Sequence, residues 1–277
     1  MEPSEHAQNE RPQDALPTPR VWLAIPVGVL VLVALWEIFA TLRAPSTVPG
    51  DDAWHAAARV VRTKMQKGDL IVFAPDWIDP VGRLHLGDVM TIDDVARMDA
   101  AKYGRIWELS IRGARSPDTA DLTPVDITDG RGIEIRRYER APAIVLADLR
   151  ERLPTARIEG GRATLVLAEV GFAPHRCIQA VAHATTPLKI TFPALTLGSQ
   201  LVGYVGIADV FTRRDVRDPG QLDVEIAGSV VASANAGVDD GWVRFAAPTT
   251  PGTSDVTIVV RSRAPGRLIC FAAEARQ

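Results

Sequence analysis

The densest group of side chains able to do chemistry lies between residues 76 and 88, in the stretch DWIDPVGRLHLGD. Asp76, His85 and Asp88 are the candidate catalytic residues. Carboxylates and an imidazole within reach of the same atom could perform general acid-base chemistry or hold a metal. However, Asp79-Pro80 and Gly87 are ordinary turn residues. The spacing therefore leaves two interpretations open, a functional site and a structural loop.

Other signals narrow the classes of function. The chain has no G-x-S-x-G, no P-loop and no Rossmann glycine fingerprint, the commonest signals for hydrolases, phosphate binding and dinucleotide binding. Its net charge of −3 argues against a nucleic-acid partner. The 2 cysteines cannot form a CxxC zinc site, and the histidines have no convincing third ligand. We expect no cofactor and no metal.

The 76–88 stretch follows a buried strand of a predicted α/β domain, residues 51–170. Asp51 or Asp52 caps a helix through Ala53 to Gln66, and Gly68 precedes the strand Asp69 to Ala74. In open α/β sheets, ligands bind at the carboxyl ends of such strands. The pattern predicts three further elements, which are a helix over Thr91 to Tyr103 and strands over Arg105 to Ile111 and Gly132 to Tyr138.

The run from Val21 to Leu42, VWLAIPVGVLVLVALWEIFATL, is almost wholly apolar. As a helix it would be roughly 33 Å long, enough to cross the hydrocarbon core of a bilayer. A cleaved signal peptide is the alternative, but its apolar core is shorter and ends at a small-x-small site. We therefore predict a single-pass anchor in membrane lipid at the cell membrane. Residues 1–20 would be a disordered tail on the inside, residues 43–50 a stalk, and the bulk of the chain extracytoplasmic.

Residues 52–139 resemble a known family. The runs DAWHAAARVVRTKMQKGDLIVFAP, YGRIWEL and GIEIRRYE are similar to the extracytoplasmic region of membrane glycosyltransferases of the dolichyl-phosphate-mannose mannosyltransferase-like class. In that family the catalytic carboxylates lie between many membrane spans, and this chain has one predicted span. The resemblance therefore transfers no catalytic residue. It implies a role in assisting a membrane glycosyltransferase.

Residues 171–277 show short alternating strands separated by turn residues, the pattern of an antiparallel β-sandwich. In LDVEIAG, Leu222, Val224 and Ile226 would face inward. The runs GYVGIAD, VEIAGS and GW, with the final strand over 267–276, resemble galactose-binding-like jelly rolls of the carbohydrate-binding kind. This resemblance makes four residues the ligand-binding candidates, namely Tyr204, Asp209, Arg213 and Trp242. The alternative is a core tryptophan beside solvated arginines.

The jelly-roll resemblance also bears on the cysteines. Cys177 would lie on the first strand of the sandwich and Cys270 on the last, and these elements often lie adjacent when a jelly roll closes. A disulfide between them would indicate an oxidising compartment. Two buried free thiols are the alternative.

The predicted class is α+β, with an N-terminal transmembrane helix, a small α/β domain and a C-terminal jelly-roll sandwich. The leading hypothesis is a non-catalytic envelope protein that binds glycan or another envelope component. An enzyme acting on envelope saccharides through residues 76–88 is the first alternative. A module that assembles with an envelope protein is the second.

Overall fold

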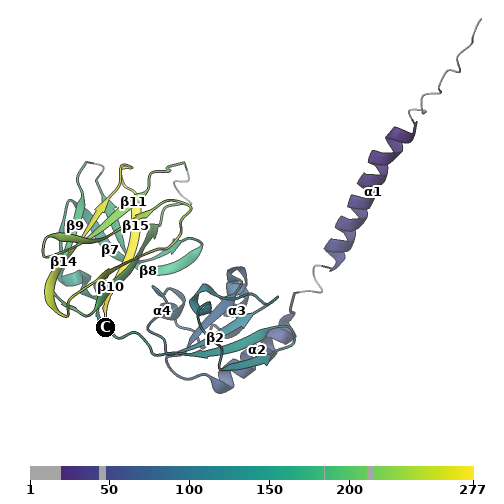
Figure 1. Cartoon of the computed structure of the whole chain (residues 1–277), viewed down its shortest axis with the longest axis horizontal. Coiled ribbons are helices and arrows are strands. Elements are labelled where there is room, and N and C mark those ends of the chain that lie inside the picture. The colour runs from purple at the N-terminus through teal and green to yellow at the C-terminus, as the bar shows by residue number, and fades with distance from the viewer. Residues whose placement is uncertain (1–19, 44–47, 184, 211–214) are drawn as a thin grey trace, which may run out of the picture. The chain divides into compact units, whose positions relative to one another are not determined.

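The computed structural model describes residues 20–43, 48–183, 185–210 and 215–277 (Figure 1). The tail predicted to be disordered, residues 1–20, lies almost wholly outside the described residues, as does half of the predicted stalk, residues 44–47. The chain divides into two compact units, Met1–Pro49 and Gly50–Gln277.

The first unit contains the helix α1 (Arg20–Arg43). Its window Ile25–Arg43 has a mean hydropathy of 2.2 and no buried residue. By length and composition this helix could cross a membrane. Its position matches the apolar run predicted from Val21 to Leu42.

The second unit begins with a small α/β layer. The helix α2 (Asp51–Lys64) precedes the strands β1 (Leu70–Ala74), β2 (Arg105–Ser110), β3 (Asp126–Asp129) and β4 (Glu134–Glu139). These strands form one sheet in the order β1-β2-β4-β3, in which β1 and β2 are parallel and the other pairs antiparallel. Trp54, Ala57 and Val61 of α2 share a hydrophobic core with this sheet. The predicted helix 53–66 and the three predicted strands are confirmed to within about two residues, whereas β3 was not predicted.

The segment predicted to be a loop over 76–88 is mostly helical, and that prediction was wrong. A 3-10 turn, η2 (Asp76–Ile78), leads into the helix α3 (Asp79–Leu86). Ile78 of η2 and Gly82 and Leu86 of α3 are buried, are spaced four apart and form one face of this segment. A Cβ on Gly82 would lie 2.1 Å from the Phe73 ring, so the absence of a side chain lets α3 pack directly on β1.

The helix predicted over Thr91–Tyr103 is also wrong in extent. Thr91 and Asp94 do form a capping box, but α4 (Ile92–Val95) ends after one turn. The carbonyl groups of Ala96, Arg97 and Met98 bond instead to groups far away in the sequence. Their partners are the Arg176 backbone N–H at 2.8 Å, His175 Nδ1 at 3.1 Å and Trp242 Nε1 at 3.1 Å.

The rest of the second unit is a β-sandwich. One sheet has the order β13-β10-β15-β8-β7 with β5 also paired to β15, and the other has the order β12-β11-β14-β9-β6. The strands are β5 (Val145–Asp148), β6 (Arg157–Glu159), β7 (Gly161–Val170), β8 (Ala173–Ala182), β9 (Leu188–Leu197), β10 (Gln200–Ile207), β11 (Gly220–Ile226), β12 (Ser229–Ala236), β13 (Val243–Pro248), β14 (Gly252–Arg261) and β15 (Leu268–Arg276). Two short helical turns, α5 (Leu149–Arg152) and η4 (Leu153–Thr155), connect β5 to β6. A further turn, η3 (Pro117–Thr119), lies between β2 and β3 of the α/β layer.

This strand pairing corrects the boundary predicted at residue 170. β5, β6 and β7 all lie before that residue, yet they pair with β15, β9 and β8 of the sandwich. The sandwich therefore begins near Val145. The predicted α+β class, with a helix, an α/β layer and an antiparallel sandwich, is confirmed.

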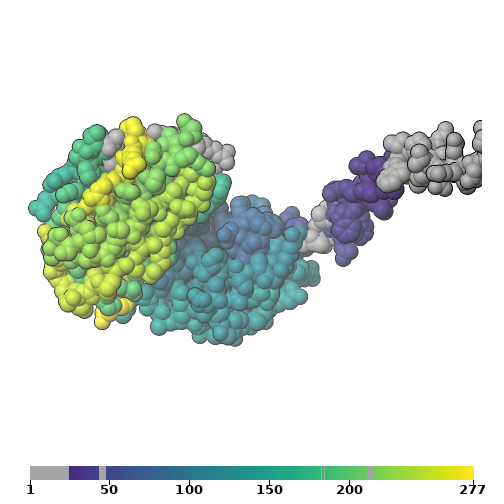
Figure 2. Space-filling model, turned by 45° about the horizontal axis from the view of Figure 1, so that its top comes forward, coloured from purple at the N-terminus to yellow at the C-terminus, as the bar shows by residue number. Residues whose placement is uncertain are grey.

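The inner faces of the two sheets form the sandwich core, which includes Leu222, Val224, Ile269 and Phe271. Because side chains alternate along a strand, Cys270, Glu274 and Arg276 of β15 lie on the opposite, outer face of the six-stranded sheet. Cys177 on β8 is bonded to Cys270, with the Cα atoms 5.6 Å apart. The space-filling view shows the sandwich, green to yellow, against the teal and blue α/β layer (Figure 2).

Gly82 generates a prediction about stability. Replacing Gly82 with Ala should lower the free energy of unfolding by about 1–3 kcal/mol, because the added methyl group would displace the Phe73 ring. Urea denaturation would measure the change. Val81→Ala is the control, because Val81 is exposed on the same helix and should change stability by no more than about 0.5 kcal/mol. A Gly82→Ala protein as stable as the wild type would contradict this packing.

Candidate functional site

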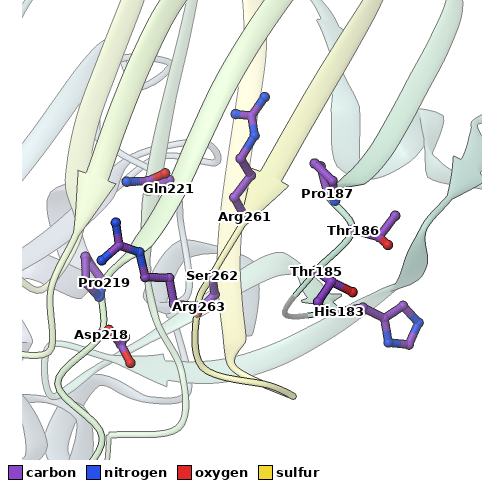
Figure 3. Close-up of a pocket in the computed structure, with 10 residues that line it drawn as sticks. All are labelled: His183, Thr185, Thr186, Pro187, Asp218, Pro219, Gln221, Arg261, Ser262 and Arg263. Carbon is purple, nitrogen blue, oxygen red and sulfur yellow. The ribbon is translucent and has the colours of Figure 1, made fainter.

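The candidate site is a hollow of about 430 Å³ at one end of the sandwich (Figure 3). Three connections surround it, namely β8–β9, β10–β11 and β14–β15. We call it the loop-end hollow. Its lining residues are His183, Thr185, Thr186, Pro187, Asp218, Pro219, Gln221, Arg261, Ser262 and Arg263.

The sheet positions one wall of the loop-end hollow. Gln221 on β11 is paired in register with Arg261 on β14. Their neighbours Leu222 and Val260 are in the core, so alternation places Gln221 and Arg261 on the outer face of the five-stranded sheet. Arg261 also forms an ion pair with Asp223, two residues along β11, which restricts its guanidinium group.

The β14–β15 connection supplies the next residues of the wall. Ser262 is buried, and its hydroxyl oxygen accepts a hydrogen bond from the Ala264 backbone N–H at 3.2 Å. Arg263 is exposed, and in the close-up its side chain extends toward Gln221 and Pro219 (Figure 3). Thr185 to Pro187 lie on the opposite side, with Arg261 between the two groups, while the His183 ring points away from the arginines (Figure 3).

The chemistry of the loop-end hollow is that of hydrogen bonding and positive charge. The described lining residues include two arginines, Arg261 and Arg263, and one carboxylate, Asp218, and Arg261 is also paired with Asp223 outside the lining. Gln221 and the threonine and serine hydroxyls can both donate and accept hydrogen bonds. Arginine binds carboxylate and phosphate groups in two-point contacts. The hollow thus suits a ligand rich in hydroxyl groups that carries negative charge.

The catalytic candidates of the 76–88 segment face different partners. Asp88 accepts two hydrogen bonds from Arg62 of α2, at 3.0 and 2.7 Å, and this pairing lowers the pKa of Asp88. His85 stacks on Trp54 with ring centroids 5.9 Å apart, and its Nε2 lies 3.8 Å from Asp51 Oδ1.

The other carboxylates of that segment have separate surroundings. Asp76 lies in the turn before α3, and Asp79 pairs with Arg83 at 2.6 Å. Burial raises the pKa of Asp79, while the charges of Arg83 and Arg97 oppose that rise. Within the part of the chain that the structure describes, no group of 3 or more His, Cys, Asp or Glu side chains is placed to hold a metal ion.

The aromatic ligand candidates lie away from the lining of the hollow. Trp242 stacks on His175 with ring centroids 4.3 Å apart and on Tyr204 at 6.0 Å. Its indole N–H donates to the Met98 carbonyl group of the α/β layer. These rings therefore form part of the contact between that layer and the outer face of the six-stranded sheet.

The two charged ligand candidates are placed as follows. Asp209 is buried just after β10, where its carboxylate accepts a hydrogen bond from the Leu268 backbone N–H at 3.3 Å and lies 3.4 Å from the buried Arg267. Arg213 lies outside the described residues.

The same outer face carries a buried network of charges. Arg276 donates to both oxygens of Asp99, at 2.9 and 2.8 Å, and to Glu274. Arg150 bonds to Asp148 and to Glu274 at 3.2 Å. Burial raises the pKa of Glu274, while the charge of Arg276 opposes the rise. This network joins the α/β layer to β15, so we assign it a structural role.

Sequence reasoning did not find the loop-end hollow. Its residues come from three stretches far apart in the sequence, and no one of them has a motif. The available signal was the pair Arg261 and Arg263, two positions apart at the end of an alternating strand.

Comparisons with protein families and with curated proteins find no match to this chain. Regions similar to part of this chain occur in solved structures that contain carbohydrate-binding modules. A CBM51-2 and INT structure of ZmpB from Clostridium perfringens has a TM-score of 0.34 and 14% identity, over 44% of this chain and 29% of that chain. The match thus spans less than a third of that neighbour.

Two further neighbours are matched over nearly their whole length. A CBM51 from Clostridium perfringens GH95 in complex with methyl-galactose has a TM-score of 0.35 and 14% identity, over 48% of this chain and 99% of that chain. A family 35 module from Clostridium thermocellum has a TM-score of 0.30 and 13% identity, over 48% of this chain and 98% of that chain. With TM-scores below 0.5, these likenesses carry no argument about ligand or activity.

His175 generates a prediction about pH. Burial lowers its pKa to about 4, and its hydrogen bond to the Arg97 carbonyl group opposes that shift. As the pH falls through about 6.5, His175 in the unfolded chain takes up a proton. In the folded chain His175 stays neutral until the pH approaches 4. The contribution of His175 to stability is therefore complete above pH 6.5 and is lost as the pH falls toward 4.

Urea denaturation at several pH values would measure that loss. His175→Asn retains a side-chain N–H donor without the titration, so its free energy of unfolding should fall less steeply below pH 6.5. His183→Asn, at an exposed histidine, is the control. If the free energy of unfolding of His175→Asn falls with pH as steeply as that of the wild type, the loss of stability does not come from the titration of His175.

Proposed function

We propose that the chain is a non-catalytic, membrane-anchored binding protein whose sandwich recognises an acidic saccharide of the cell envelope. One observation carries the proposal, which is the loop-end hollow lined by arginines, hydroxyls and an amide. Sugar hydroxyls exchange hydrogen bonds with such groups. The arginines add affinity for a carboxylate or phosphate substituent.

A catalytic role through the 76–88 segment has less support. General acid-base chemistry needs groups within hydrogen-bond reach of one reacting atom. Asp88 is directed to Arg62, His85 to the start of α2 and Asp79 to Arg83. The partners of these side chains instead suit a role in holding α3 against α2.

The proposal also includes the anchor and its compartment. The length and composition of α1 support insertion into membrane lipid. The Cys177–Cys270 bond supports an oxidising, extracytoplasmic location for residues 50–277. A role beside a membrane glycosyltransferase rests on the resemblance of residues 52–139 alone.

The saccharide proposal generates a binding prediction. A glycan array probed with the full chain in detergent would identify an acidic saccharide, and calorimetry would then measure its affinity. Arg263→Ala should weaken binding by about 10-fold or more, because a charge-assisted hydrogen bond contributes about 1.5–3 kcal/mol. Arg261→Ala should act in the same direction.

Arg162→Ala is the matched control, because Arg162 is exposed on β7 of the same sandwich and does not line the hollow. It should bind as the wild type does. Saccharide binding that survives both Arg261→Ala and Arg263→Ala would overturn the site. An array without any bound glycan, together with capture of an envelope protein, would favour the assembly alternative.

The anchor generates a second prediction. Replacing Leu30 and Val33 together with Arg should reduce the carbonate-resistant membrane fraction, because each arginine in mid-helix costs about 2.5–3.5 kcal/mol of insertion free energy. The double alanine variant at these positions is the control and should remain in the membrane. Release of the wild-type chain by carbonate would contradict anchoring by α1.

A further inference from the structure

The helix α3 has a second apolar face that the fold leaves in water. Trp77, Val81 and Leu84 have exposed fractions of 58%, 40% and 80%. Their spacing, four residues and then three, places them on one side of the η2–α3 segment. We call these three residues the α3 outer face.

The α3 outer face is not part of the hydrophobic core of the α/β layer. Ile78, Gly82 and Leu86 on the other side of the same segment are already buried against the α/β sheet. A helix that packs by one face normally presents polar side chains on the other. An exposed tryptophan and leucine at these positions therefore point to an apolar partner outside the fold.

The position of α3 near residues 44–50, the segment that joins α1 to α2, points to the membrane as that partner. His85, next to Leu84, stacks on Trp54 of α2, and its Nε2 lies 3.8 Å from Asp51, the first residue of α2. Residues 44–50, seven in number, join Arg43 at the end of α1 to Asp51. Even fully extended, this tether would span only roughly 25–30 Å. If α1 spans a bilayer, these residues limit how far Asp51 can lie from the bilayer surface, and α3 packs beside Asp51 at the start of α2.

The residue types of the α3 outer face are those found at a bilayer surface. Tryptophan is enriched where hydrocarbon meets lipid headgroups, and leucine and valine add apolar area. The guanidinium carbon of Arg112 lies 6.0 Å from the centre of the Trp77 ring and adds a positive charge beside it. Asp76 and Asp79 lie on the same segment, so the local charge is mixed and the apolar side chains must supply most of the affinity.

We propose that the α3 outer face inserts into the interface of the bilayer that holds α1, so that the α/β layer rests on the membrane. This inference rests on the proposed membrane anchor. It adds a second, peripheral contact to that anchor. The contact would limit rotation of the α/β layer relative to the bilayer.

Site-specific fluorescence of the full chain in phosphatidylcholine vesicles tests the inference. The native cysteines are bonded to each other, so Leu84→Cys provides a single thiol for an environment-sensitive fluorophore. Its emission should shift to the blue, and doxyl-labelled phosphatidylcholine should quench it. Val230→Cys on β12, 57% exposed, is the matched control and should show neither change.

Flotation of the vesicles separates failure of the anchor from failure of this inference. A chain that does not float overturns both. A chain that floats but shows no lipid quenching at residue 84 overturns this inference alone. Self-quenching between labelled chains without lipid quenching would overturn it in favour of a second copy on this face. In a second test, Trp77→Asp combined with Val81→Asp should abolish the quenching at residue 84 while the chain still floats.

Discussion

The outer face of the six-stranded sheet carries buried charged groups and the disulfide, and the α/β layer packs against this part of the sheet. Arg276, Glu274 and the disulfide are buried there although they point away from the sandwich core. The segment around Asp99 covers this face, and its carboxylate pairs with Arg276. A buried charge without its partner is strongly unfavourable, so the α/β layer and the sandwich depend on each other.

The contact between the α/β layer and the sandwich also bears on two of the residues predicted to bind a ligand. Trp242 and Tyr204 have the residue types of a sugar platform, but their rings lie beside His175 in a contact within the protein. The loop-end hollow lies at the β8–β9, β10–β11 and β14–β15 connections instead, and the described residues that line it include no Phe, Tyr or Trp. The proposed recognition therefore relies on charge and hydrogen bonding.

Local patterns in the sequence predicted most of the strands, because the alternation of Leu222 and Val224 with polar neighbours reflects one buried face. The same reasoning failed at Thr91–Tyr103. There the capping box that starts a helix is present, but the carbonyl groups of residues 96–98 accept hydrogen bonds from His175, Arg176 and Trp242. Competition from partners so distant in sequence cannot be seen in a local window. The loop-end hollow could not be predicted for the same reason, since Thr186 and Arg263 are distant in the sequence and line the same hollow only in the fold.

The interface at Asp99 and Arg276 has a mechanical consequence. If the chain is held in a membrane by α1 and holds a ligand at the loop-end hollow, tension enters at Asp51 and leaves at the far connections of the sandwich. That load must pass through the α/β layer and across its contact with β15. The paired arginine and carboxylates, the bonded cysteines and the pairing of β5 with β15 all lie on or beside this path. The strength of attachment under force would then be set by this interface as well as by affinity for the ligand.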